Sequence, residues 1–178
     1  KGKYQPFATS GPDGIPRIAN FGEGFHFNVT GLIHDVDGFP TTDPKKTELL
    51  ITRLYQKIES RAKEICLVES ENLSDASIVL CSYGATARST VHAAKEARKA
   101  GMKVGLIRLK TLWPFADFVF DALGSNVKTV VVCEMNMGQI VREVERCAKG
   151  RFNVIGVNIS RGTPITPDEI LNKIENVT

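Results

Sequence analysis

Short apolar runs alternate with amphipathic segments from Ala76 to the end of the chain, a rhythm that predicts four strands and four helices. The strands are expected at 77–81, 103–109, 128–133 and 153–159, and the helices at 86–99, 114–123, 138–148 and 167–177. The last helix begins with Thr166, Pro167 and Glu169, the pattern of a capping box. Nearly continuous apolar strands with helices between them are typical of a parallel sheet covered on both faces. We therefore expect a small doubly wound α/β domain.

The first 42 residues have a different pattern, because seven glycines and four prolines interrupt them. This density of Gly and Pro excludes a helix, although Phe25, Phe27 and Val29 alternate with polar residues and predict one short strand. Solvated linkers are polar, so an irregular arm with this much aromatic surface is expected to pack against something. Its six aromatic residues are Tyr4, Phe7, Phe21, Phe25, Phe27 and Phe39.

A helix is expected directly after this arm. Asp43 can cap it, Pro44 suits its first position, and apolar residues recur on one face for about 20 residues. The apolar positions are Leu50, Leu54, Ile58, Ala62 and Ile65. The sequence thus predicts an irregular aromatic arm over 1–42, a connecting helix and linker over 43–70, and the α/β domain over 71–178.

The composition is that of a globular chain, with 42% hydrophobic and 24% charged residues among 178. Lys plus Arg exceeds Asp plus Glu by 23 − 20 = 3, without a basic block, so we expect no nucleic-acid partner. No apolar run reaches the ~20 residues of a membrane helix. The cysteines form no C-x-x-C pair and are expected to be buried thiols, which favours the cytoplasm. They are Cys66, Cys81, Cys133 and Cys147.

The loops after the strands are the best place for chemistry, because parallel strands bring their carboxyl ends to one edge of the sheet. We predict a docking or anion-binding site there, formed by Thr86, Arg88, Gly138, Gln139, Arg161, Gly162 and Thr163. In the alternative interpretation these residues make turns and caps, while Trp113 and Met137 pack an interface. A dinucleotide site is disfavoured, since the first loop offers only Gly84. Asp35 to Gly38 is expected to be a turn and not a calcium loop.

Four ordered segments resemble a known family: 82–89 (SYGATARS), 105–115 (GLIRLKTLWPF), 134–140 (EMNMGQI) and 161–165 (RGTPI). Together they are similar to the carboxyl-terminal, transketolase-like domain of the alpha subunit of 2-oxoacid:ferredoxin oxidoreductases, closest to the 2-oxoglutarate type. The arm agrees with this resemblance. Residues 30–38 are similar to the family's T-G-x-E-H-D-x-x-G segment, with Ile33 at the acidic position, and 14–17 resemble its G-[IV]-S-P-R stretch with one residue fewer.

The resemblance implies an enzyme that uses thiamine diphosphate and magnesium to decarboxylate a 2-oxoacid, passes electrons through an iron–sulfur cluster to ferredoxin, and transfers the acyl group to coenzyme A. The diphosphate motif G-D-G…N and a cluster-binding cysteine set are missing from these 178 residues. We therefore expect this chain to bind none of these cofactors, to lack a catalytic centre, and to dock on the beta subunit and the remaining domains. Because it begins with Lys1, we expect it to be a piece of a longer subunit.

Four arm residues are candidates for a substrate-pocket edge or an interface, namely Arg17, His26, Thr30 and His34. For His26 and His34 the favoured interpretation is that they are packing or turn residues. Two other functions stay open: a stand-alone domain that binds an anion or coenzyme A at its strand-end loops, and the carboxyl-terminal domain of another thiamine enzyme. The arm segment favours the ferredoxin-linked family over the latter.

Overall fold

The computed structural model describes residues 4–177, so that Lys1 lies outside the described part. The chain divides into two compact units, residues 1–61 and residues 62–178, which we call unit 1 and unit 2. Each is described by itself. The contacts group the helix after the arm with unit 1. Whether residues 43–70 work as a separate linker stays a prediction.

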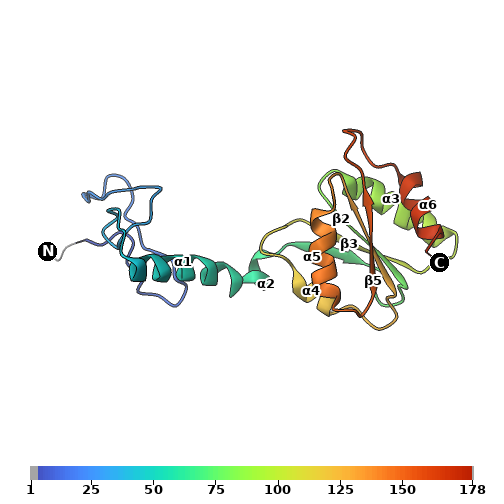
Figure 1. Ribbon diagram of the computed structural model, residues 1–178, viewed down its shortest axis with the longest axis horizontal. Coiled ribbons are helices and arrows are strands. Elements are labelled where there is room, and N and C mark those ends of the chain that lie inside the picture. The colour runs from blue at the N-terminus through green and yellow to red at the C-terminus, as the bar shows by residue number, and fades with distance from the viewer. Residues whose placement is uncertain (1–3, 178) are drawn as a thin grey trace. The chain divides into compact units, whose positions relative to one another are not determined.

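Unit 2 is built around a five-stranded sheet with the order β1-β3-β2-β4-β5 (Figure 1). Strands β2 to β5 are parallel, whereas β1 runs antiparallel to β3. The strands are β1 (Val68–Glu71), β2 (Ile78–Tyr83), β3 (Val104–Leu109), β4 (Thr129–Glu134) and β5 (Asn153–Asn158). The helices are α2 (Ala62–Ile65), α3 (Thr86–Lys99), α4 (Asp117–Asp121), α5 (Gln139–Ala148) and α6 (Pro167–Glu175).

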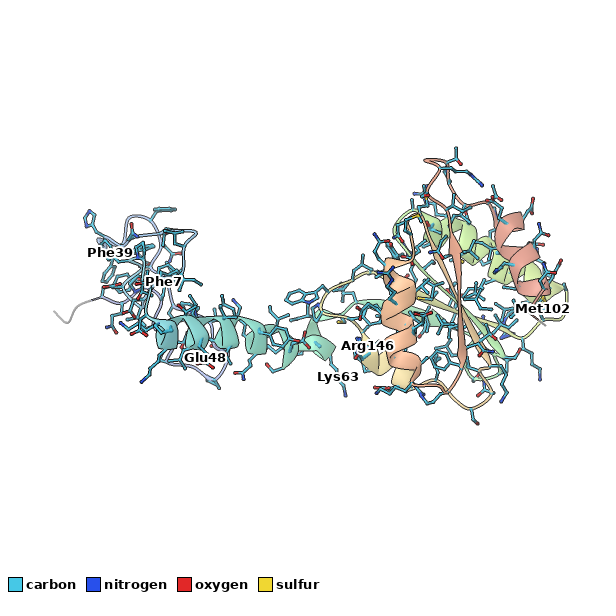
Figure 2. The ribbon with its side chains drawn as sticks, in the orientation of Figure 1. Phe7, Phe39, Glu48, Lys63, Met102 and Arg146 are labelled. Carbon is cyan, nitrogen blue, oxygen red and sulfur yellow. The ribbon has the colours of Figure 1, made fainter. Side chains whose placement is uncertain are left out.

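Both faces of the sheet are covered, because neighbouring residues of each central strand point to opposite sides. In β2, Val79 packs into a core with Phe120 and Val144 from the side of α4 and α5. Leu80 packs into a second core with residues of α3 and α6 (Figure 1). The Arg146 guanidinium of α5 joins α5 to α4 through two bonds of 2.7 and 2.6 Å to the Asp117 carboxylate (Figure 2). The predicted doubly wound α/β class is confirmed.

The predicted starts of two helices agree with the structure, whereas one strand at the edge of the sheet was not predicted. α3 spans 86–99 as predicted, and Thr166 closes a capping box with Glu169 at the start of α6. The four predicted strands form the parallel part of the sheet, and the sequence missed β1, which adds an antiparallel edge strand. Its sequence V-E-S-E has a single apolar residue, and Glu69 pairs with Arg108 and Lys110 of the neighbouring strand and its end. An edge strand exposed on this scale carries no apolar pattern to detect.

Unit 1 consists of the arm and α1 (Pro44–Glu59). As predicted, Asp43 caps α1, with Oδ1 accepting hydrogen bonds from the backbone N–H groups of Lys45 (2.9 Å) and Lys46 (3.4 Å). The helix is 16 residues long, shorter than expected, because it ends at Ser60 and the chain resumes as α2. Its side chains are all at least partly exposed.

The predicted strand at Phe25–Val29 was wrong. In the described part of unit 1 the β-type pairing is a single bridge between His34 and Pro40. Phe25 and Phe27 alternate because both rings contact Tyr4, at centroid distances of 4.5 and 6.0 Å. A strand needs a backbone partner, which aromatic contacts do not supply.

The arm is held by close backbone packing at Gly38. As predicted, Asp35 to Gly38 forms a turn, in which Gly38 N–H donates to the Asp35 carbonyl (2.9 Å). Gly38 has φ +87°, and a Cβ there would lie 2.2 Å from the Asn28 carbonyl oxygen. Only glycine fits this position. Phe7 packs inside the arm, whereas Phe39 next to the turn is exposed (Figure 2).

The capping box of α6 makes a direct prediction. Thr166→Ala removes the oxygen that accepts from Glu169 N–H at 3.3 Å, so we expect the free energy of unfolding in urea to fall by about 1 kcal/mol. Thr166→Ser keeps this oxygen and is the control, expected to stay within about 0.5 kcal/mol of the wild type. Equal stability of the two variants would contradict a capping role.

Candidate functional site

The strand order creates a switch point between β2 and β4, where the connections leave in opposite directions. Folds of this type bind ligands in the crevice outside these two carboxyl ends. The loop after β2 begins at Gly84, and the loop after β4 runs from Met135 to Gly138. The chemistry of these two loops therefore decides what the edge can bind.

A buried carboxylate lies at this switch point. Glu134, the last residue of β4, is fully buried. Its Oε2 accepts from Ile140 N–H (3.0 Å) and the Tyr83 hydroxyl (3.2 Å). Its Oε1 accepts from Val141 N–H (3.0 Å) and Asn158 Nδ2 (3.3 Å). The chain thus supplies its own anion to the start of α5, the place where a ligand phosphate would bind.

Asn136 closes the same network from the loop. Its Nδ2 donates to the Tyr83 hydroxyl (2.6 Å), and its Oδ1 accepts from the N–H groups of Gly138 (2.9 Å) and Gln139 (3.2 Å). Gly138 adopts φ +90°, so the loop can turn directly into α5. The backbone donors of Gly138 to Val141 are all satisfied from within the chain.

The Tyr83 hydroxyl connects the end of β2 to Glu134 at the end of β4. Burial raises the pKa of its hydroxyl above the ordinary value, and the neighbouring Glu134 carboxylate raises this pKa further. The hydroxyl therefore stays protonated and bridges Glu134 to Asn136.

A second internal anion lies at the loop after β5. Arg161 donates from Nε to Thr163 Oγ1 (2.7 Å) and from Nη2 to Glu169 Oε1 (2.5 Å). The backbone N–H of Thr166, and then Arg161, hold the pKa of Glu169 below its usual range. The Arg161 guanidinium is therefore engaged by the capping box of α6.

The start of α3 is the remaining part of the edge. Its first residues have no side-chain cap, and Thr86 is buried with its carbonyl accepting from Thr90 Oγ1 (3.0 Å). Arg88 is exposed, and its guanidinium has no hydrogen bond or ion pair with any residue in the described range 4–177.

The seven predicted edge residues do lie on the loops and helix starts at one edge, but they do not converge on a single anion site. Gly138 and Gln139 are bonded to Asn136, and Arg161 is bonded to Thr163 and Glu169. Gly162 is exposed in the same loop as Arg161, and Thr86 and Arg88 lie in the first turn of α3. Sequence reasoning missed the organising residues Tyr83, Glu134, Asn136 and Asn158. The available signal was an acidic residue directly after the apolar run Val130–Cys133, where burial requires hydrogen-bond partners.

The four arm candidates are dispersed within unit 1. His34 packs at 4.2 Å between ring centroids against Phe7 and lines a groove of about 330 Å³ together with Arg53. Arg17 pairs with Asp13 (2.5 Å), His26 is exposed, and Thr30 Oγ1 accepts from Leu32 N–H (3.1 Å). Of the four, His34 is the one that lines this groove.

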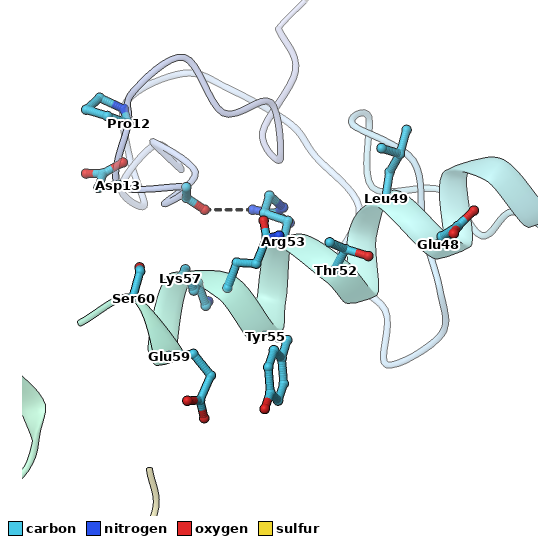
Figure 3. A pocket seen from close by; sticks show the side chains of 12 residues that line it. Pro12, Asp13, Glu48, Leu49, Thr52, Arg53, Tyr55, Lys57, Glu59 and Ser60 are labelled. Carbon is cyan, nitrogen blue, oxygen red and sulfur yellow. Dashed lines mark hydrogen bonds between the residues drawn. The ribbon is translucent and has the colours of Figure 1, made fainter. Parts of the chain in front are cut away.

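A larger and more open groove of about 740 Å³ follows one side of α1 (Figure 3). Arg53 Nη1 donates across it to the Gly14 carbonyl (2.9 Å) and ties the arm to the helix. The acidic side chains Glu48 and Glu59 lie eleven residues apart, or about 16 Å along the helix. This spread of charges does not form a converging set of ligating groups.

Within 4–177, no group of three or more His, Cys, Asp or Glu side chains is arranged to hold a metal ion. Among the same residues, the four cysteines are buried and form no disulfide, and no three of them are grouped as the ligands of an iron–sulfur cluster would be. No helix in this range is long and apolar enough to cross a bilayer.

Comparison with known proteins matches unit 2 to a family. Residues 76–170 match the model of the pyruvate:ferredoxin oxidoreductase core domain II. The chain belongs to this family. Core domain II thus lies within unit 2 and contains the switch point, and the predicted resemblance to 2-oxoacid:ferredoxin oxidoreductases is confirmed.

Curated relatives extend the similarity beyond core domain II. The chain is 42% identical over 156 residues to 2-oxoglutarate synthase subunit KorA of Methanocaldococcus jannaschii, covering 88% of this chain and 42% of that protein. The KorA subunit of Methanothermobacter thermautotrophicus is 38% identical over 178 residues, covering 97% and 46%. The chain thus spans less than half the length of these relatives.

Solved structures agree with the fold of core domain II. The 2-oxoglutarate:ferredoxin oxidoreductase from Magnetococcus marinus, with 2-oxoglutarate, coenzyme A and succinyl-CoA bound, aligns with TM-score 0.77 and 26% identity. The alignment covers 93% of this chain and 29% of that one. A split-gene transketolase aligns with TM-score 0.52 and 14% identity over 61% of this chain and 40% of that one, which supports the transketolase-like fold.

The buried carboxylate of core domain II predicts a large effect from a small change. Glu134→Gln places an amide NH₂ group against the hydrogen-bond donors that now face the carboxylate. We therefore expect the free energy of unfolding in urea to fall by about 2–3 kcal/mol relative to the wild type. Glu145→Gln, at an exposed position of α5, is the matched control and should stay within about 0.5 kcal/mol. Equal effects of the two substitutions would show that the Glu134 carboxylate does not stabilise the fold.

Tyr83 predicts a pH dependence. Because its pKa is higher in the folded state, its contribution is fully present below pH about 10 and is lost as the pH rises toward the folded-state value. Tyr83→Phe should lower the free energy of unfolding by about 1 kcal/mol at pH 8, and the difference from the wild type should narrow above pH 10. Tyr55→Phe, on exposed α1, is the control. If the difference in free energy of unfolding between the wild type and Tyr83→Phe grew above pH 10, the raised pKa of Tyr83 would be contradicted.

Proposed function

We propose that this chain is part of the alpha subunit of a 2-oxoacid:ferredoxin oxidoreductase of the 2-oxoglutarate type. The observation that carries the proposal is the 42% identity to a 2-oxoglutarate synthase subunit over 88% of the chain. The reaction forms a thioester between the acyl group and coenzyme A, releases carbon dioxide and passes two electrons to ferredoxin. The two KorA relatives described above are 42% identical over 156 residues and 38% identical over 178, whereas a ketoisovalerate oxidoreductase subunit is 36% identical over 149.

Within this enzyme, we assign the chain a structural and docking role, without a catalytic centre of its own. Support comes from the switch point, where Glu134 and Asn136 take up the backbone donors that a cofactor phosphate would need. The buried cysteines, of which no three form a ligand group within 4–177, point the same way. Thiamine diphosphate, magnesium and the iron–sulfur cluster then belong to the other domains and to the beta subunit.

The remaining assignments follow from the same proposal. Coenzyme A is a co-substrate of the assembled enzyme, and ferredoxin docks on that assembly. We assign the enzyme to the cytoplasm, which is supported by four buried cysteines that form no disulfide within the described chain.

The test compares the 178-residue chain alone with the enzyme assembled from the complete subunit and its partners. We expect no 2-oxoacid-dependent ferredoxin reduction by the chain alone. We expect coenzyme A-dependent reduction by the assembled enzyme, fastest with 2-oxoglutarate and slower with pyruvate or 2-oxoisovalerate.

An assembly that omits coenzyme A is the control. Turnover by the isolated chain would refute the docking role, and a preference for another 2-oxoacid would refute the substrate assignment.

A further inference from the structure

The exposed large apolar side chains of unit 2 lie at one edge of its sheet, for the described residues 62–177. Trp113 is 62% exposed and Met137 is 76% exposed. The set, which we call the carboxyl-edge patch, is Leu67, Leu112, Trp113, Met135 and Met137. Trp and Met are enriched in protein interfaces, so their strong exposure here indicates a surface that contacts another protein surface.

The topology explains why these residues meet. Two follow β3, two follow β4, and Leu67 precedes the antiparallel strand β1, whose start pairs with the end of β3 through Val68 and Leu109. The Leu67 carbonyl accepts from Lys110 N–H (2.9 Å). Because β3 and β4 both flank β2, the contributing strands lie about 10 Å apart.

The opposite edge of the sheet behaves differently. There the apolar residues of the connecting loops, Leu73, Met102 and Phe152, are buried or partly buried. If the surface of this domain were hydrophobic without a specific role, apolar side chains would be exposed at both edges of the sheet. The exposure is instead confined to the edge that carries the strand-end loops.

The polar groups at the carboxyl edge favour a protein over a small anion. The start of α5 is satisfied by the Glu134 carboxylate, and the start of α6 by the reciprocal capping box of Thr166 and Glu169. Arg88 is left as a cation without a partner among the described residues. One guanidinium beside an apolar patch does not form a phosphate cradle, but it matches a protein surface with an apolar centre and one carboxylate.

The occupant is indicated by the length and path of the chain. The chain spans 42–46% of its KorA relatives, so such a subunit has more than half of its residues elsewhere. The chain also enters unit 2 at this edge, because α2 leads directly to Leu67. Resting on the proposed function, we infer that the carboxyl-edge patch docks a surface of the same subunit from outside these 178 residues, with an Asp or Glu opposite Arg88.

Hydrogen–deuterium exchange tests this on the assembled enzyme and on the 178-residue chain. We expect amides of 110–116 and 134–139 to exchange at least about tenfold more slowly in the assembly, while 100–103 and 149–152 at the opposite edge do not change. Equal exchange of the edge loops in both samples would overturn the inference. Protection that grows with concentration in the isolated chain would identify a second copy as the occupant and overturn it too.

Variants in the complete subunit identify the side chains responsible. In the double variant Trp113→Ser/Met137→Ser, the amides of 134–139 should exchange at least about tenfold faster in the assembly than in the wild type. The double variant Trp113→Phe/Met137→Leu keeps the apolar area and should retain the slow exchange. Arg88→Glu should act like the serine pair and Arg88→Lys should not. The urea midpoint of the 178-residue chain should be the same for all of them. Unchanged exchange in the serine pair would overturn the inference.

Enzyme activity separates this inference from the proposed function. An active wild-type enzyme with an unprotected edge refutes the docking surface and leaves the function. A protected edge in an assembly without 2-oxoglutarate-dependent reduction refutes the function and leaves the docking surface.

Discussion

The geometry of the carboxyl edge depends on one buried carboxylate. An ionisable group without water is costly unless its oxygens are fully hydrogen-bonded, and Glu134 achieves this with donors from β2, β5 and the start of α5. These bonds connect three strand ends and a helix into one unit. Met135 and Met137 are held outward because the residues between and after them are tied inward.

The same arrangement explains why a common fold has a different use here. Doubly wound sheets often leave the switch point open for a phosphate, with a helix start as its receptor. In core domain II the receptor is filled from within by Glu134 and Asn136, and the next loop is filled by Glu169. An edge whose backbone donors are satisfied from within, and whose loops are exposed, is well suited to protein contact.

The sequence predicted most of unit 2 because local signals and global fold agree there. Continuous Val and Ile runs, Pro167 after a capping Thr166, and glycines after helices each specify an element without knowledge of the rest. Three features were not accessible in this way. The strand β1 is polar, the alternation of Phe25 and Phe27 reflects contacts with Tyr4, and the Glu134 network joins residues from distant loops. The predicted edge residues lie in the loops and helix starts of this edge, but pairings such as Arg161 with Glu169 depend on side-chain direction, which spacing does not encode.

The antiparallel strand β1 also has a mechanical consequence. It is the first extended segment of unit 2, and all four of its residues are in register with β3, from Val68 opposite Leu109 to Glu71 opposite Leu106. A pull along this strand loads its ladder hydrogen bonds together, because every residue of β1 is paired with a residue of β3. Tension that enters unit 2 through β1 is therefore shared by the whole ladder instead of falling on one bond.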